Sequence, residues 1–136
     1  MSYAISASLQ AAVFQHLTLD PNLSALVGTD IYDALPPGIL PLAYVSLGPE
    51  SVRDKSDVTG HGALHVFTVS VVTDVAGFDT AKTIGAAVSD ALVDADLTLT
   101  RGQLVSLNFY RASAKRVGTG QGRRIDLTFR ARVDDV

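Results

Sequence analysis

The feature that most constrains the fold is a strict alternation of apolar and polar residues in the segment RRIDLTFRARVDD, residues 123–135. The apolar set is Ile125, Leu127, Phe129, Ala131 and Val133, and the polar set is Arg124, Asp126, Thr128, Arg130 and Arg132. Successive side chains of a β-strand point to opposite faces, so this period of two predicts a strand over residues 123–133 with one buried face. The chain must therefore build a sheet with a core on one side.

Two other segments carry the period of a helix instead. Over residues 3–17, with Ser2 available as an N-cap, the recurring apolar residues are Ile5, Leu9, Ala12, Val13 and Leu17. Over residues 77–93, one helical face holds Phe78, Ala81, Ile84, Val88 and Leu92. We therefore predict two long amphipathic helices, and expect them to lie against the sheet.

A short third helix is predicted between the first helix and the sheet. Asp20 is a suitable N-cap, Pro21 suits the first helical position, and Gly28 suits the residue past the end. Prolines around Gly38 then interrupt regular structure, and we interpret this stretch as a rigid connection.

Three further segments have strand-like composition, at residues 42–47, 64–73 and 103–116. The last of these leads through GTGQG, residues 118–122, into the C-terminal strand. Residues 51–62 contain almost no large apolar side chain, so we predict a long mobile loop there.

The predicted order is helix, short helix, strand, strand, helix, strand, strand. This order is typical of an α+β domain, and 136 residues suit a single domain over residues 1–136. We expect an antiparallel sheet of about four to five strands with the two long helices packed on one face.

Composition excludes several functions. The net charge of −3 disfavours nucleic-acid binding along a broad surface, and the absence of cysteine excludes a disulfide or a thiolate nucleophile. We find no predicted membrane span or export signal. Charged residues make up only 18% of the chain against 47% hydrophobic, so we expect a partner to cover part of the surface.

No motif in the chain predicts catalysis, a cofactor or a metal. A phosphate-binding loop needs its glycines before a helix, whereas GTGQG precedes a strand and is interpreted as a hairpin tip. His61 and His65 would lie about 13 Å apart in a strand, too far to share a zinc ion. Carboxylates close in sequence, such as Asp134 and Asp135, lie near element ends. The sequence therefore does not predict an enzyme.

The segment SLQAAVFQHLTLDPNLSALVGTDIYDALPPGILPLAYVSLG, residues 8–48, resembles the opening of a widespread phage family known as DUF3168. The pattern LQ.A....L is followed by D..L..LVG..IYD and a later PYV.LG-like ending. The strand LHVFTVSVVT and the helix AKTIGAAVSDAL are also similar to family members, although the usual tryptophan of the central strand is missing.

This resemblance implies a tail terminator or tail-completion protein of long-tailed phages or gene transfer agents. Such a subunit is an α+β protein that forms a hexameric ring on the last ring of the tail tube, stops tube polymerisation and gives the head-side connector a docking surface. The implied partners are further copies of this chain, the tail tube protein, a head-completion or stopper protein, and DNA only in transit through the lumen. The implied location is the neck of a virion or phage-like particle assembled in the bacterial cytoplasm.

Two alternatives remain open at this point. One is a different neck component, such as a head-completion stopper, because such proteins share the ring geometry. The other is a small enzyme or ligand-binding domain with a pocket between helix and sheet.

Two groups of charged residues are the candidate interface or lumen residues. The first group, in the predicted loop, is Arg53, Asp54, Lys55, Asp57 and His61. The second, at the start and on the polar side of the C-terminal strand, is Arg123, Arg124, Asp126, Arg130 and Arg132. We expect the loop to become ordered on assembly, and the strand residues to meet a neighbouring subunit or line a lumen; a plain solvated sheet face is the alternative.

Overall fold

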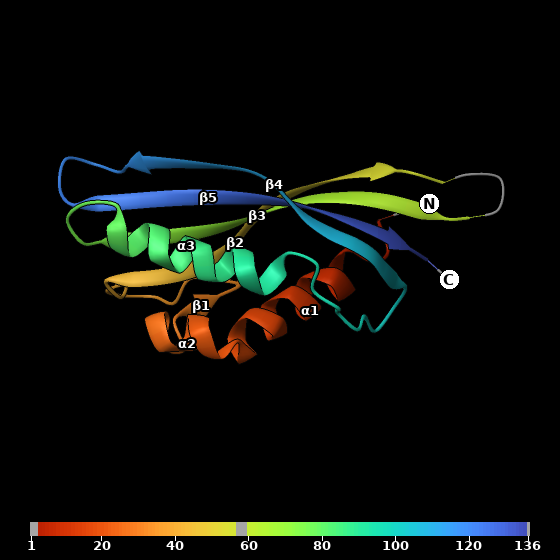
Figure 1. Cartoon of the computed structure of the whole chain (residues 1–136), viewed down its shortest axis with the longest axis horizontal. Coiled ribbons are helices and arrows are strands. Elements are labelled where there is room, and N and C mark those ends of the chain that lie inside the picture. Colours follow the sequence, from red (N-terminus) through yellow and green to blue (C-terminus); the bar gives the residue numbers. More distant parts are fainter. Residues whose placement is uncertain (1–2, 57–59, 136) are drawn as a thin grey trace.

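Five strands form one twisted sheet in the order β1-β2-β3-β5-β4 (Figure 1). The computed structural model of the chain describes residues 3–56 and 60–135. The strands are β1 Ile31–Tyr32, β2 Ala43–Asp54, β3 Gly62–Asp74, β4 Gln103–Arg116 and β5 Gly122–Asp134. All neighbours are antiparallel except β1 and β2, which are parallel.

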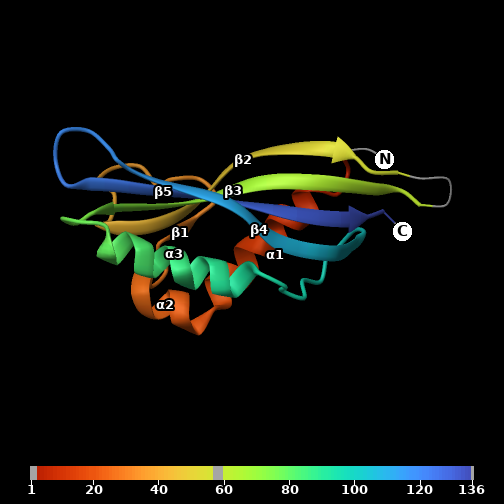
Figure 2. The same ribbon diagram turned by 45° about the horizontal axis from the view of Figure 1, so that its top comes forward.

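The helices lie together below the sheet in two different views (Figures 1 and 2). They are α1 Ser6–Leu19, α2 Pro21–Val27 and α3 Asp79–Leu92. The chain is therefore an α+β protein, as predicted. We call the face of the sheet that points away from the helices the outer face.

The C-terminal strand has the alternation that its sequence predicts. Ile125, Leu127 and Phe129 are at most 6% exposed, whereas Arg130 is exposed. Phe129 stacks on Phe67 of the neighbouring strand β3, with 5.8 Å between ring centroids. Burial of this apolar row is the main favourable term that holds the sheet to the helices.

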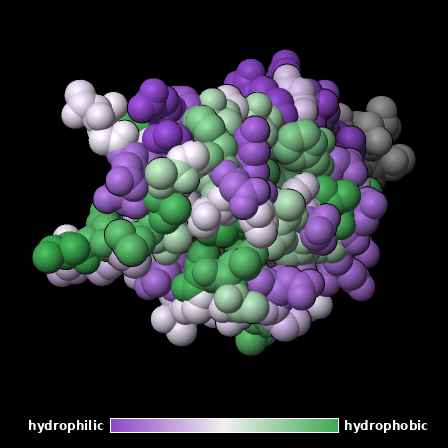
Figure 3. All heavy atoms as spheres, turned by 60° about the vertical axis from the view of Figure 1, so that its left-hand side comes forward, coloured by the Kyte–Doolittle hydropathy of each residue, from purple (hydrophilic) through white to green (hydrophobic). Residues whose placement is uncertain are grey.

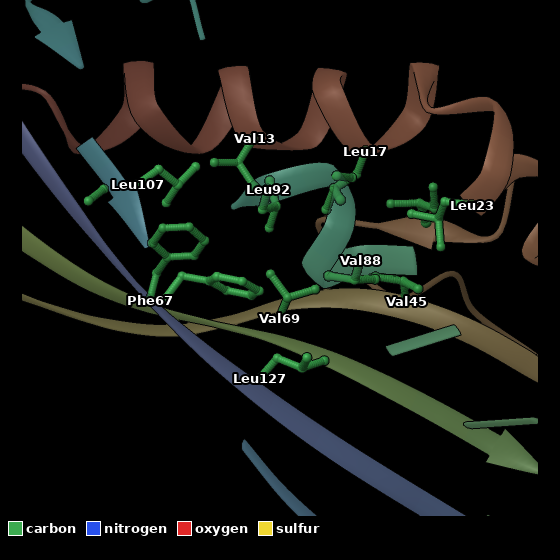
Figure 4. Close-up of a cluster of buried hydrophobic side chains, with 14 of the residues drawn as sticks. Val13, Leu17, Leu23, Val45, Phe67, Val69, Val88, Leu92, Leu107 and Leu127 are labelled. Carbon is green, nitrogen blue, oxygen red and sulfur yellow. The ribbon is translucent and has the colours of Figure 1, made fainter. Parts of the chain in front are cut away.

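Side chains from both layers meet in one core (Figure 4). Val13 and Leu17 come from α1, and Val88 and Leu92 from α3; each is at most 2% exposed. They pack against the helix-facing side of the sheet, where Val69 is fully buried. The helical stripes predicted from the sequence are therefore the buried faces of α1 and α3.

The helix ends follow the predicted signals only in part. The Asp20 carboxylate accepts a hydrogen bond from the Leu23 amide at 2.9 Å, Pro21 opens α2, and Gly28 beyond its end has φ +60°. In contrast, α1 begins at Ser6 rather than near residue 3, and Ile5 at its N-cap makes no side-chain capping bond. The proposed cap Ser2 lies outside the described residues.

The prediction of a long mobile loop over residues 51–62 is wrong at both ends of that range, because residues 51–54 and 62 belong to strands. β2 continues to Asp54 and β3 begins at Gly62, with Arg53 paired to Leu64 in register. The Lys55 amide still donates to the Gly62 carbonyl at 2.8 Å. The hydrogen bonds between strands join backbone groups. A strand can therefore continue through residues with polar side chains wherever an adjacent strand supplies a partner. Residues 57–59 lie outside the described residues.

β1 was not predicted. It has two residues, Ile31 and Tyr32, too few to show any period. Its register places Ile31 beside Val45, and the Val45 amide donates to the Asp30 carbonyl at 3.0 Å. β1 thus extends the sheet at the edge where the connection to β2 leaves it.

Candidate assembly surfaces

The polar row of β5 lies on the outer face of the sheet. Arg124 Nε is 2.9 Å from Asp126 Oδ1, and the Ser70 hydroxyl donates to the same carboxylate oxygen at 2.6 Å. Burial alone would raise the pKa of Asp126, but the bonds from Ser70 and Arg124 hold it below its ordinary value. The charges of Arg124 and Asp126 therefore largely neutralise each other, and the pair adds little to the electrostatic potential of the outer face.

The two remaining arginines of this row are held by different contacts. The Arg130 guanidinium lies 3.7 Å from the centroid of the Tyr110 ring on β4, a cation–π contact. Arg132 donates from Nη2 to the Lys55 carbonyl at 3.1 Å, which joins β5 to the residue after β2. Arg130 thus keeps an exposed and unneutralised charge on the outer face.

β4 adds two cations that the sequence pattern did not single out. Its register places Arg111 beside Thr128 and Lys115 beside Arg124, so both lie on the outer face. The alternation of β4 is broken by register shifts at Leu104/Ser106 and Phe109/Arg111, which explains why a single period did not place these residues.

These strands enclose a shallow groove of about 550 Å³ on the outer face. Its lining includes Pro49, Thr68, Arg111, Ser113, Arg124 and Thr128. Hydroxyl and guanidinium groups predominate among these residues, so the groove offers hydrogen-bond donors rather than a dry apolar site.

Arg123 does not join this row, although its place in the sequence grouped it there. It is 9% exposed and lies on the helix-facing side, where its guanidinium is 5.0 Å from the Phe78 ring centroid. It also donates to the carbonyls of Gln121 and Gly122 at 2.9 and 3.1 Å. Strand alternation places Arg123 opposite to Arg124, so its contacts fix the start of α3 against the β4–β5 hairpin.

The charged residues of the predicted loop lie at the far end of the β2–β3 hairpin. Arg53 is on the outer face and Asp54 on the opposite one, and both are exposed. Hydrogen bonds from Ser56 to the Asp54 carboxylate lower the pKa of Asp54. Lys55 and His61 are exposed at the same end, whereas Asp57 lies outside the described residues. The structure therefore gives this group a position separate from Arg124 and Asp126.

GTGQG is the tip of the β4–β5 hairpin, as predicted. The Val117 amide donates to the Gly122 carbonyl at 2.9 Å and Gly118 has φ +70°. A strand both precedes and follows the glycines, so they do not open a helix as the glycines of a phosphate-binding loop do.

The described residues include neither a group of three or more His, Asp or Glu side chains placed to hold a metal nor a helix long and apolar enough to span a membrane. Large apolar side chains are exposed at several places, of which two contain neighbouring residues of the chain. One is the connection between β1 and β2, with Leu35, Ile39 and Leu42; the other is β4, with Phe109 and Tyr110. Exposed apolar groups of this kind mark surfaces that other protein chains cover.

Comparison with known proteins agrees with such a role. A family model described as tail completion protein gp17 matches residues 11–134. A chain in the solved structure "Virion of native gene transfer agent (GTA) particle" is 63% identical, with a TM-score of 0.93, and the match covers 98% of this chain and 99% of that chain. No curated protein matches the sequence.

Fold, surfaces and comparisons together define a structural protein of virions rather than an enzyme. The chain belongs to the tail completion protein gp17 family.

Proposed function

We propose that this chain forms a closed ring of six copies that caps the tail tube, stops its polymerisation and joins the tail to the head-completion connector. The observation that carries the proposal is the 63% identity, over nearly the whole of both chains, to a component of a gene transfer agent virion. The two chains share one fold over nearly their whole length, which supports the same kind of assembly for both. The direct partners are the tail tube protein on one rim and a head-completion or stopper protein on the other.

The layered fold supports a ring subunit. The helices cover one face of the sheet and leave the outer face free, so a single subunit offers two different sides. Closed rings of identical chains need two different patches per subunit, one for each neighbour, and the remaining faces can bind other proteins.

The outer face supports a second part of the proposal, that it faces the lumen through which DNA passes. Arg111, Lys115 and Arg130 supply positive charge, whereas Asp126 neutralises Arg124. Each phosphate contact strengthens DNA binding and its salt dependence. A lining with few unneutralised cations attracts DNA but does not hold it tightly, as transit requires.

Deletion of the gene in the particle-producing cell tests the capping role. We expect filled heads beside unattached tails of uncontrolled length, and restoration of normal particles when the gene is supplied from a plasmid. Tails of normal length already attached to heads would contradict the proposal. Tails of normal length that remain separate from heads would instead assign the chain to the head-side connector.

A further inference from the structure

The connection between β1 and β2, residues 33–42, is unusual for a surface loop because its exposed side chains are aliphatic. Ile39 is completely exposed, and Leu35, Leu40 and Leu42 are between 36% and 66% exposed. Hydrophobic residues also gather at this end of the molecule in Figure 3, and one group of them projects from its outline. Exposure of several large aliphatic side chains together is costly in water, so a partner is expected to cover them.

The same loop is conformationally restricted. Prolines 36, 37 and 41 each fix their own φ, and they also limit the residue that precedes them. The Leu42 carbonyl accepts a hydrogen bond from the Asp74 amide at 2.7 Å, which ties the end of the loop to β3. A loop that is already held in one shape loses little entropy when it docks. We call residues 33–42 the apolar loop.

A groove of about 330 Å³ lies at the opposite edge of the sheet, between α3 and β4 on the helix-facing side. Small residues on both walls leave it open, and its lining includes Gly85, Ala86, Phe109, Ala112, Ala114 and Leu127. Phe109 is 45% exposed and meets Phe129 edge-on at 6.0 Å between centroids. This α3–β4 groove is therefore apolar and has room for aliphatic side chains.

The apolar loop cannot reach the groove of its own subunit. β3 and β5 lie between β2 and β4, and three strand spacings amount to about 14 Å. The two features nevertheless lie at nearly the same level along the strands, because Ala43 pairs with Thr73, Thr73 with Arg123, and Arg123 with Arg116. A neighbour docked through them is displaced across the sheet with little shift along the strands. A closed ring needs this arrangement when the strands run along its axis.

The charges around the two features are opposite. Asp33 at the start of the apolar loop and Asp74 beside its end are both exposed. Lys82 lines the groove, and Arg116 follows Ala114 on the same face of β4. β4 is also the last strand of the sheet, and the edge that it leaves free has no strand neighbour among the described residues. Opposite charges set register and partner choice, and uncovered edge strands tend to be covered in assemblies.

From this complementarity we infer that the apolar loop of one copy docks into the α3–β4 groove of the next copy, head to tail, around the ring. The contact rests on the proposed ring and names its interface. Each subunit uses the loop toward one neighbour and the groove toward the other, so every copy makes the same contacts.

Site-specific cross-linking between two variants tests the contact directly, because the chain has no cysteine of its own. One variant carries Ile39→Cys in the apolar loop, and the other carries Ala86→Cys in the groove wall. A short bis-maleimide reagent should link the two variants when they are mixed, and should link neither variant to itself. Ile39→Cys mixed with Thr98→Cys, an exposed position outside the groove, is the matched control and should stay unlinked.

Two disruptive variants provide a second readout. Ile39→Glu and, separately, Ala112→Glu should each weaken self-association at least tenfold by light scattering, with unchanged circular dichroism spectra. Both positions are exposed, so neither substitution disturbs the core. The same cross-linking is carried out on assembled particles, so a subunit that associates only on the tail still gives a result.

The outcomes separate this contact from the proposed function. Overlong, unattached tails in the deletion strain would support the capping role. If the two cysteine variants then gave no cross-link, and both glutamate variants assembled normally, the contact would be overturned while the capping role stood. A specific cross-link between Ile39→Cys and Ala86→Cys would support the contact. If the deletion strain nevertheless made normal tails attached to heads, the contact would stand and the capping role would be overturned.

Discussion

Glu50 ties the first turn of α1 to the sheet. Its carboxylate accepts hydrogen bonds from the Tyr3 and Ser6 hydroxyls, and its Oε2 lies 3.5 Å from Nδ1 of the fully buried His65. Burial alone would raise the pKa of Glu50, but the hydrogen bonds from Ser6 and Tyr3, together with the nearby His65 ring, bring it below the ordinary value of 4.5. The ionised form is therefore the one that stabilises the fold.

We expect Glu50→Gln to lower the free energy of unfolding by about 1–2 kcal/mol at pH 7, because the neutral amide cannot make charge-assisted hydrogen bonds. A pKa that folding lowers contributes stability above the unfolded-state pKa, and that contribution disappears as the pH falls through the folded-state pKa. The difference between wild type and variant should thus shrink below pH 4.5. Urea unfolding at several pH values measures it, with Asp90→Asn on the exposed side of α3 as control. A difference that stays constant down to pH 3 would contradict this assignment.

Gly102 is the second residue whose identity is fixed by its surroundings. Its φ is +78°, and a Cβ at this position would lie 2.5 Å from Ile5 Cδ1 and 2.8 Å from the Asp134 carbonyl oxygen. Gly102→Ala should therefore destabilise the protein by about 2 kcal/mol or more. Gly120→Ala is the matched control, because no atom lies within 4 Å of its Cβ position. Equal melting temperatures for the two variants would contradict this prediction, because they would show that the structure accommodates a Cβ at residue 102 without loss of stability.

At the scale of elements, the sequence predicted each helix and strand in which a hydrophobic pattern repeats over many residues. It missed the strand segments that are held only by backbone hydrogen bonds to a neighbouring strand. The alternation over residues 123–133 and the stripe over residues 77–93 predicted β5 and α3 nearly complete. The far half of β2 was assigned to a loop, because Arg53 and Asp54 carry no apolar signal and are held through the backbone. The position of Arg123 was missed for a related reason, since strand alternation turns it away from Arg124.

The paired arm of β2 and β3 has a measurable consequence. In the free subunit, hydrogen exchange should be slower for the amide of Lys55, bonded to the Gly62 carbonyl, than for the amides of the exposed loop residues 34, 35, 39 and 40. NMR or mass-spectrometric exchange on purified protein gives this comparison. Equal, fast exchange at Lys55 and in the loop would mean that the arm opens freely before assembly.

At the scale of the whole molecule, most of the candidate charges lie at two places, and Arg123 lies apart from both on the helix-facing side. Arg124, Asp126 and Arg130 share the outer face with Arg111 and Lys115, whereas Arg53, Lys55 and His61 lie at the end of the β2–β3 arm. The sequence could select these residues by type and period. It could not group them, because the grouping depends on the order of the strands in the sheet.

If the outer face meets DNA, the double variant Arg111→Gln, Arg130→Gln should bind duplex DNA more weakly and with a shallower dependence on salt. The slope should fall by up to about one unit for each phosphate that the variant no longer neutralises. Arg101→Gln is the control, because Arg101 pairs with Asp135 instead of joining the outer-face row. Fluorescence anisotropy over a range of salt concentrations measures both. An unchanged slope in the double variant would show that the outer face points away from the lumen.

The alternation of β5 also determines how this chain tolerates mutation. Its odd-numbered positions from Ile125 to Val133 lie in the core, whereas the even-numbered positions face away from the helices. In a library of single substitutions, loss of soluble protein should therefore peak at every second position along β5. Loss of infectious or gene-transferring particles from well-folded protein should peak at the positions between. Alternate residues of one strand would then be under selection for two different properties, stability at the odd-numbered positions and assembly at the even-numbered ones.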